Sequence, residues 1–231
     1  MGTSMRTLLL ALCLSTTLAC SSQLGLGRAR TMDAGKHKVN TGFEFDVVSA
    51  QTGQGQAIPL PWTQAAAGYH VGATDRVEVG ARLWGFTVPR VLTTYGAAVD
   101  TKIGVIRPDK GRGKFQAATG LSLAYHQARY GGQPNHVFGA TLPVLLGYSL
   151  GRHELTFGPR VADYIWTSYG QNTINTFHAG GSVSLSIAIR ETFELVPEAV
   201  VLYSPVSFNG EVESERGVTT LQLGLGGSWQ L

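Results

Sequence analysis

The sequence predicts an all-β chain that closes as an antiparallel, up-and-down transmembrane β-barrel of about ten strands, within a range of eight to twelve. Apolar side chains recur at every second position through most of residues 36–231, the period of a strand with two different faces. Each alternating segment exceeds the roughly 9–11 residues that a tilted strand needs to cross a bilayer. Short connections between the segments take turns with longer ones, which is the sidedness of a membrane barrel.

The last segment shows the alternation most clearly. Leu223, Leu225 and Trp229 share one face, whereas Gln222 and Ser228 belong to the other. A helix would place apolar residues three and four positions apart. The final segment is therefore a strand with one apolar and one polar face.

Ten segments repeat this pattern in order along the chain. They are 36–48, 60–73, 76–88, 93–107, 114–128, 136–150, 152–167, 173–189, 191–204 and 216–231. The brief connections are 73–75, 109–113, 151 and 190–191. The longer connections are 49–59, 89–92, 129–135, 168–172 and 205–215. The long ones are expected to face outside, and 205–215, with three glutamates, is the best candidate for a surface contact.

Aromatic side chains gather near the expected strand ends, as in the girdles that anchor barrels at both membrane interfaces. The predicted girdle residues are Phe43, Phe45, Trp62, Tyr69, Trp84, Tyr95, Tyr125, Tyr164, Trp166, Phe177, Phe193, Tyr203 and Trp229. A few residues break the pattern. Asp163 shares the apolar parity of its strand, and Pro143, Pro159 and Pro197 lie inside strands, where a bulge or an early strand end would accommodate them.

Composition limits the class of protein. The 231 residues hold 30 glycines and only 14% charged residues, and the net charge of +3 is too small to indicate nucleic-acid binding. No run of 18 apolar residues exists, so no membrane-spanning helix is expected. No second domain or internal repeat is apparent.

The N-terminus is predicted to be a targeting segment and not part of the fold. Residues 1–19 combine Arg6, an apolar stretch and small residues before Cys20, and they resemble a bacterial lipoprotein signal. That resemblance implies that Cys20 is lipidated and becomes the mature N-terminus; an ordinary secretory signal is the alternative, because Thr17 stands where lipoproteins usually have Leu. Residues 20–35 are predicted as a periplasmic tether, and 36–231 as the barrel.

If the apolar face meets lipid, the polar face lines the lumen. Six charged residues are expected near mid-height there: Glu44, Arg82, Asp100, Lys102, Arg160 and Glu198. A barrel of eight to ten strands is narrow and largely filled by side chains, so these charges are expected to pair as a plug. An ion or solute path is the alternative.

Two histidines, His126 and His178, are predicted to point inward near the outer rim. Enzymes exist on this fold, and His126, His136, Asp46 and Asp163 could be drawn into a rim site, but no nucleophile–base pair follows from the spacing. No metal or cofactor motif is present. The prediction is therefore no enzyme, no metal and no cofactor.

The mature chain resembles small bacterial outer-membrane β-barrel proteins of a lipidated kind, through the signal at Cys20, the strand pattern and the final strand ending in Trp229 and Leu231. The resemblance implies outer-membrane lipid and the barrel-insertion machinery as partners, and a lipid-anchored N-terminus on the periplasmic side. It identifies no surface partner. The predicted function is a non-enzymatic outer-membrane lipoprotein with an envelope structural or surface-interaction role. The alternatives are a narrow solute channel, a rim hydrolase and a soluble lipocalin-like binder.

Overall fold

The computed structural model describes the barrel and the segment that precedes it. The described residues are 28–51, 57–88, 92–108, 114–130, 133–168, 173–204, 207–209, 212–213 and 218–231. The predicted signal over residues 1–19, the predicted lipidation site Cys20 and the rest of residues 20–27 lie outside the described residues. None of the described residues forms a helix long and apolar enough to cross a membrane.

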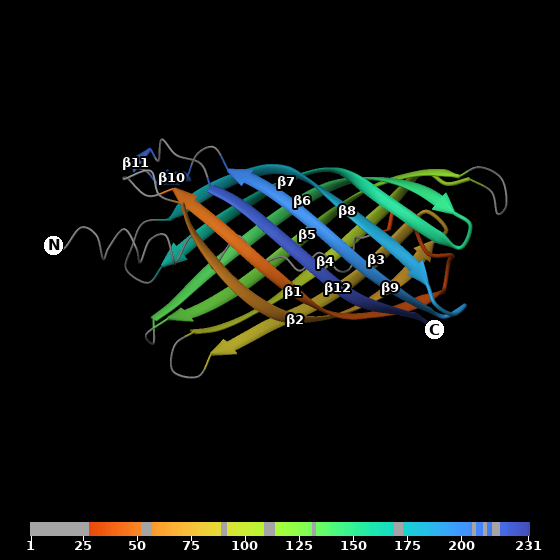
Figure 1. The fold of residues 1–231 in the computed structure, drawn as a ribbon, viewed down its shortest axis with the longest axis horizontal. Coiled ribbons are helices and arrows are strands. Elements are labelled where there is room, and N and C mark those ends of the chain that lie inside the picture. Colours follow the sequence, from red (N-terminus) through yellow and green to blue (C-terminus); the bar gives the residue numbers. More distant parts are fainter. Residues whose placement is uncertain are drawn as a thin grey trace.

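Ten long antiparallel strands form one closed wall (Figure 1). They are β1 (His37–Gln51), β2 (Ala57–Thr74), β3 (Val77–Val88), β4 (Leu92–Ile106), β5 (Phe115–Tyr130), β6 (Gln133–Leu150), β7 (His153–Ser168), β8 (Ile174–Ala188), β9 (Phe193–Ser204) and β12 (Val218–Gln230). Each pairs with its neighbours in sequence, and β12 pairs with β1 from Lys38↔Gln230 to Ala50↔Val218. The predicted closed ten-stranded barrel is therefore confirmed.

Two short strands lie in the predicted contact loop. They are β10 (Ser207–Asn209) and β11 (Val212–Glu213). β10 pairs with Ile174–Thr176 of β8, beyond the point where β9 ends, and β11 pairs with β10. This hairpin continues the wall at the end of the barrel where β1 ends and β2 begins, called the loop end here. The opposite end is called the turn end, and its connections are 75–76, 107–114, 151–152 and 189–192.

The strands run further into the loop end than the sequence predicts. β1 continues to Gln51 and β2 begins at Ala57, so most of the predicted loop 49–59 is ladder; β5 and β6 likewise consume most of 129–135. Backbone hydrogen bonds between paired strands satisfy these residues better than a loop would.

The barrel is polar inside and apolar outside. Along β12, Thr220 and Gln222 are 0% and 2% exposed, whereas Leu223 and Leu225 are 44% and 53% exposed. The other long strands show the same arrangement: large apolar side chains are exposed, whereas most of the buried side chains are polar or charged. An apolar outer surface with a polar interior is what a strand in lipid requires.

Two of the residues predicted for the aromatic girdles lie inside the barrel instead. Trp84 and Tyr164, predicted for the aromatic girdles, point into the lumen and are 4% and 1% exposed. They join small apolar clusters inside the barrel with residues such as Val137 and Ala98, so the lumen is not uniformly polar. The side chains of Trp62 and Trp166 lie outside the described set.

Each of the three prolines interrupts the ladder on one side of its strand and keeps the ladder on the other side. The β5–β6 ladder skips from Thr119↔Val144 to Ser122↔Thr141, next to Pro143, and Thr119 Oγ1 donates to the Pro143 carbonyl at 3.0 Å. The β6–β7 ladder skips between Pro143 and Leu146, opposite Pro159. At Pro197 the β9–β12 ladder is unbroken, but the β8–β9 ladder skips from Ser184↔Glu198 to Ile187↔Leu195. Missing donors therefore interrupt the ladder without shifting it.

Candidate functional site

The lumen is where the chemistry-bearing side chains converge. All six charges predicted for its middle point inward and are at most 6% exposed. Side chains buried to this degree exclude water around their charged groups. Each charge therefore needs a partner, because removing an isolated charge from water costs several kcal/mol.

Arg82 and Asp100 form the best-defined pair. Nε of Arg82 donates to one carboxylate oxygen of Asp100 at 2.5 Å, and Nη2 donates to the other at 2.8 Å. Nη2 also donates to Ser122 Oγ at 3.0 Å. β3, β4 and β5 are thereby joined across their inner faces by a bidentate, charge-assisted contact, which fixes geometry as well as charge.

Lys102 pairs with Glu78, which is not one of the six charges predicted for mid-height. Its Nζ lies 2.7 Å from Glu78, which also meets Lys38 Nζ at 3.0 Å and His70 Nδ1 at 3.5 Å. The β3–β4 register places Glu78 directly opposite Lys102. A correct register, more than residue type, would have predicted this pair.

Arg160 and Glu198 approach within 3.6 Å, and Arg160 Nη2 also donates to Ser182 Oγ at 3.3 Å. Glu44 accepts from Gln64 Nε2 at 2.8 Å. Every one of the six predicted residues thus has a polar partner inside the barrel.

The two predicted rim histidines lie in the lumen and are 2% and 1% exposed. Trp84 Nε1 donates to His126 Nδ1 at 3.1 Å, and the ring of His178 stands edge-on to Tyr164 at 5.3 Å. His136, by contrast, bonds the Tyr125 hydroxyl. Among the described residues, no serine, cysteine or carboxylate reaches His126 or His178, so no activated nucleophile is assembled there.

No group of three or more His, Cys, Asp or Glu side chains within the described part of the chain could hold a metal ion. Asp163 keeps its outward parity and pairs by register with Ala140 and Phe177, so it takes no part in the lumen.

Sequence reasoning missed a second feature, at the turn end. Residues 28–36, called the mouth segment here, cross the opening inside the wall, although most of them were expected to belong to a tether. Ala29 and Thr31 are 1% and 2% exposed. The amide of Ala29 donates to Glu154 at 2.9 Å, and Thr31 Oγ1 donates to the Asp75 carbonyl at 2.8 Å.

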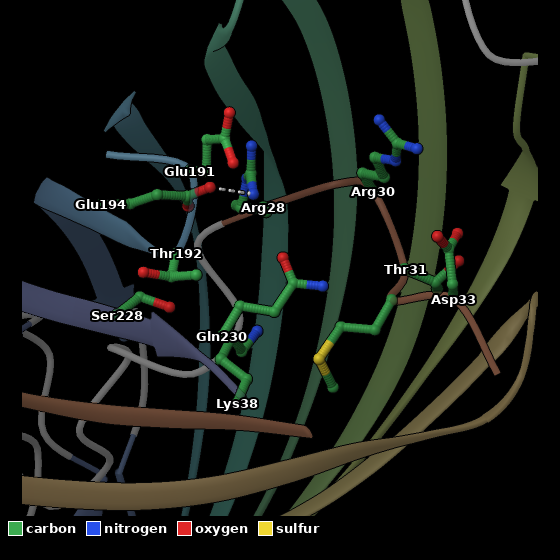
Figure 2. A pocket seen from close by; sticks show the side chains of 11 residues that line it. Arg28, Arg30, Thr31, Asp33, Lys38, Glu191, Thr192, Glu194, Ser228 and Gln230 are labelled. Carbon is green, nitrogen blue, oxygen red and sulfur yellow. Dashed lines mark hydrogen bonds and ion pairs between the residues drawn. The ribbon is translucent and has the colours of Figure 1, made fainter. Parts of the chain in front are cut away.

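Ion pairs at Arg28 and at Asp33 hold the mouth segment to the barrel wall. Arg28 Nη1 lies 2.6 Å from Glu194 (Figure 2). Its Nε lies 3.6 Å from Glu154. Asp33 pairs with Arg107. The mouth segment carries no alternation, so nothing local in its sequence predicts these contacts.

Comparison with known proteins supports the fold. No family model and no curated protein matches the sequence. The outer-membrane protease OmpT from Escherichia coli is similar in structure, with 6% identity, a TM-score of 0.50 and coverage of 88% of this chain and 100% of that one. An outer-membrane channel from Pseudomonas putida F1 is similar at 10% identity, a TM-score of 0.50 and coverage of 91% and 100%.

These likenesses show a fold shared with bacterial outer-membrane β-barrels. One neighbour is a protease and the other a channel, so the fold does not select a function. The function has to be inferred from the lumen and the surface of this chain.

Proposed function

We propose that this chain is a closed, non-enzymatic β-barrel lipoprotein of the bacterial outer membrane, with an envelope structural or surface-interaction role. The observation that carries the proposal is that burial is the reverse of that in a water-soluble protein. Ion-paired side chains fill the lumen, while large apolar side chains cover the outside. A pore would require hydrated charges, and the six mid-lumen charges are at most 6% exposed.

The outer surface has the form of a membrane belt. Exposed aromatic side chains stand at both ends of the strands, with Phe115, Tyr148 and Trp229 at the turn end and Tyr95 and Tyr203 at the loop end. Aliphatic side chains, together with the apolar rings of Phe43 and Phe45, occupy the positions between. Amphipathic rings suit the interface, and aliphatic ones suit the hydrocarbon.

The orientation follows from the connections. Short turns face the periplasm in barrels of this kind, so the turn end is assigned to that side. From Cys20 to Arg28 the chain can span at most about 29 Å, at roughly 3.6 Å per residue. A lipid on Cys20 can therefore enter the periplasmic leaflet while the mouth segment stays in place.

The loop end is the surface that can meet a partner outside. β10 of the β10–β11 hairpin pairs with β8 beyond the last pairing of β9, at the loop end (Figure 1). A backbone hairpin that projects from a rigid wall is a suitable contact element.

Cell fractionation and bilayer recording test the proposal together. The full chain is expected in the outer-membrane fraction, with a gel mobility that shifts on boiling, an acylated Cys20 and no current steps in a planar bilayer. Cys20→Ser should lose the acyl mass and keep the mobility shift. Steady current from the unaltered chain would favour the channel alternative, and a chain that stays soluble would overturn the proposal.

A further inference from the structure

We propose that the rim of the barrel at the turn end is a binding surface for the headgroups of anionic phospholipids in the periplasmic leaflet. The inference rests on the proposed function, because lipid headgroups surround this rim only if the barrel spans the membrane in the assigned direction. It adds a preferred lipid class, and the residues that select it, to that barrel.

Exposed cations surround the turn end. Each of its four connections carries one, and another stands just before β1. These five residues, called the rim cations here, are Lys36, Arg76, Lys114, Arg152 and Arg190. Within the described part of the chain, none of the five forms an ion pair with another side chain. Their charge is therefore available to an anionic partner.

The carboxylates of the same end do not neutralise the rim cations. Asp33 pairs with Arg107, and two carboxylates of the mouth meet Arg28. Asp75 and Glu191 are exposed and can offset at most two of the five rim cations. The rim therefore keeps an excess of positive charge.

The loop end has no comparable ring of cations among its described side chains. Arg129 is the one exposed lysine or arginine there. The predicted contact loop between β9 and β12 instead carries Glu211, Glu213 and Glu215. A general attraction to any anionic surface would not require this difference between the two ends.

The rim cations lie beside aromatic side chains of the membrane belt. Lys114 Nζ is 6.0 Å from the centre of the Tyr148 ring, which is exposed on the outer wall. The amide of Arg190 donates to the carbonyl of Phe193, whose ring lies 4.8 Å from that of Trp229. Outward-facing rings near strand ends mark the level of the headgroups. The rim cations are thus placed at the depth of the lipid phosphates.

This arrangement fits lipid better than it fits a protein partner. A protein binds one contiguous patch, whereas the rim cations are spread over connections all around the wall. Headgroups surround the whole rim and offer a phosphate to each cation. A lysine or arginine near an anionic membrane surface strengthens the attraction about fivefold, and salt screens it.

Lipid-specific quenching of Trp229 tests the proposal. The full chain, with its other three tryptophans changed to phenylalanine, is placed in phosphatidylcholine vesicles that contain brominated phosphatidylglycerol or brominated phosphatidylcholine at equal fractions. At low salt, phosphatidylglycerol should bind beside Trp229 about fivefold more strongly than phosphatidylcholine. At 1 M potassium chloride, where the Debye length is about 3 Å, the preference should vanish. Both leaflets hold the same mixture, so the direction of insertion does not affect the result.

Two double variants locate the effect. Lys36→Gln with Arg190→Gln removes the rim cations that adjoin β1 and β9, the two neighbours of β12, and should bring the preference at Trp229 close to one. Lys114→Gln with Arg152→Gln removes the same charge next to β5, β6 and β7, further round the wall, and should keep the parent preference. A heat-modifiable gel shift shows that each variant is folded.

The outcomes separate this proposal from the proposed function. An inserted parent that both lipids quench equally would overturn headgroup binding and would favour an acidic periplasmic protein as the partner of the rim. A preference that Lys36→Gln with Arg190→Gln leaves unchanged would overturn it as well. A parent that neither brominated lipid quenches is not in the bilayer, and that result would overturn the proposed function instead.

Discussion

Replacing Arg82 by methionine is expected to lower the free energy of unfolding by about 3–5 kcal/mol. The reason is the carboxylate that remains: Asp100 is 3% exposed and receives both Nε and Nη2 of Arg82. Without them it is a buried charge with no cation. Reversible unfolding in denaturant, with the barrel in lipid vesicles and tryptophan emission as the signal, measures the loss.

Two companion variants isolate the cause. Arg82→Met together with Asp100→Leu removes both charges and should regain most of the loss, because an apolar pair replaces an ionic one at little net cost. Arg152→Met alters an exposed arginine in the turn between β6 and β7 and should stay within about 0.5 kcal/mol. If Arg82→Met behaved like Arg152→Met, the lumen would have to be hydrated, and the closed-barrel account would lose its basis.

Placing an arginine at Leu223 is expected to destabilise the inserted barrel by about 2–4 kcal/mol. Leu223 lies in the middle of β12, is 44% exposed on the outer face, and pairs with Phe45 and Ala199. A charge there would sit near the centre of the hydrocarbon. The same unfolding experiment in vesicles gives the difference.

Leu231→Arg is the matched control, because Leu231 is also exposed and follows the end of the same strand. Near the interface an arginine costs about 0–1 kcal/mol. On a water-facing surface, Leu223→Arg would itself stay within about 0.5 kcal/mol. Equal effects at the two positions would therefore argue against a lipid-facing surface.

The strands could be predicted from the sequence because their signal is local. Period-two alternation along each strand places all ten long strands within three residues of their observed bounds. β10 and β11 were not expected, since strands of three and two residues are too short to show a period.

The lumen could be predicted only in part. Parity alone places Arg82 and Asp100 inside, because side-chain direction alternates with residue number. The partners of these residues depend on the register between neighbouring strands, which is set by the length of the turn that joins them. Parity does not give this register, so it does not predict the contact of Lys102 with Glu78. Position near a strand end predicts Trp84 for a girdle, whereas the parity that it shares with Arg82 on β3 places it in the lumen.

The mouth segment could not be predicted at all. Its partners lie up to 166 residues away in sequence, as in the contact of Arg28 with Glu194. No period or motif in residues 28–36 signals such contacts. Only the closed three-dimensional mouth, with Gly72 and Gly147 leaving room, makes the segment part of the barrel.

Fluorescence quenching by lipids brominated in their acyl chains tests most directly which face meets the membrane. Variants that each keep one of the four tryptophans would be reconstituted in such vesicles. Trp229, which is 40% exposed on the outer face, should be strongly quenched, and Trp84, which is 4% exposed in the lumen, should not. Quenching of Trp84 with Trp229 unaffected, or no quenching of either, would contradict an apolar exterior in lipid and a polar interior.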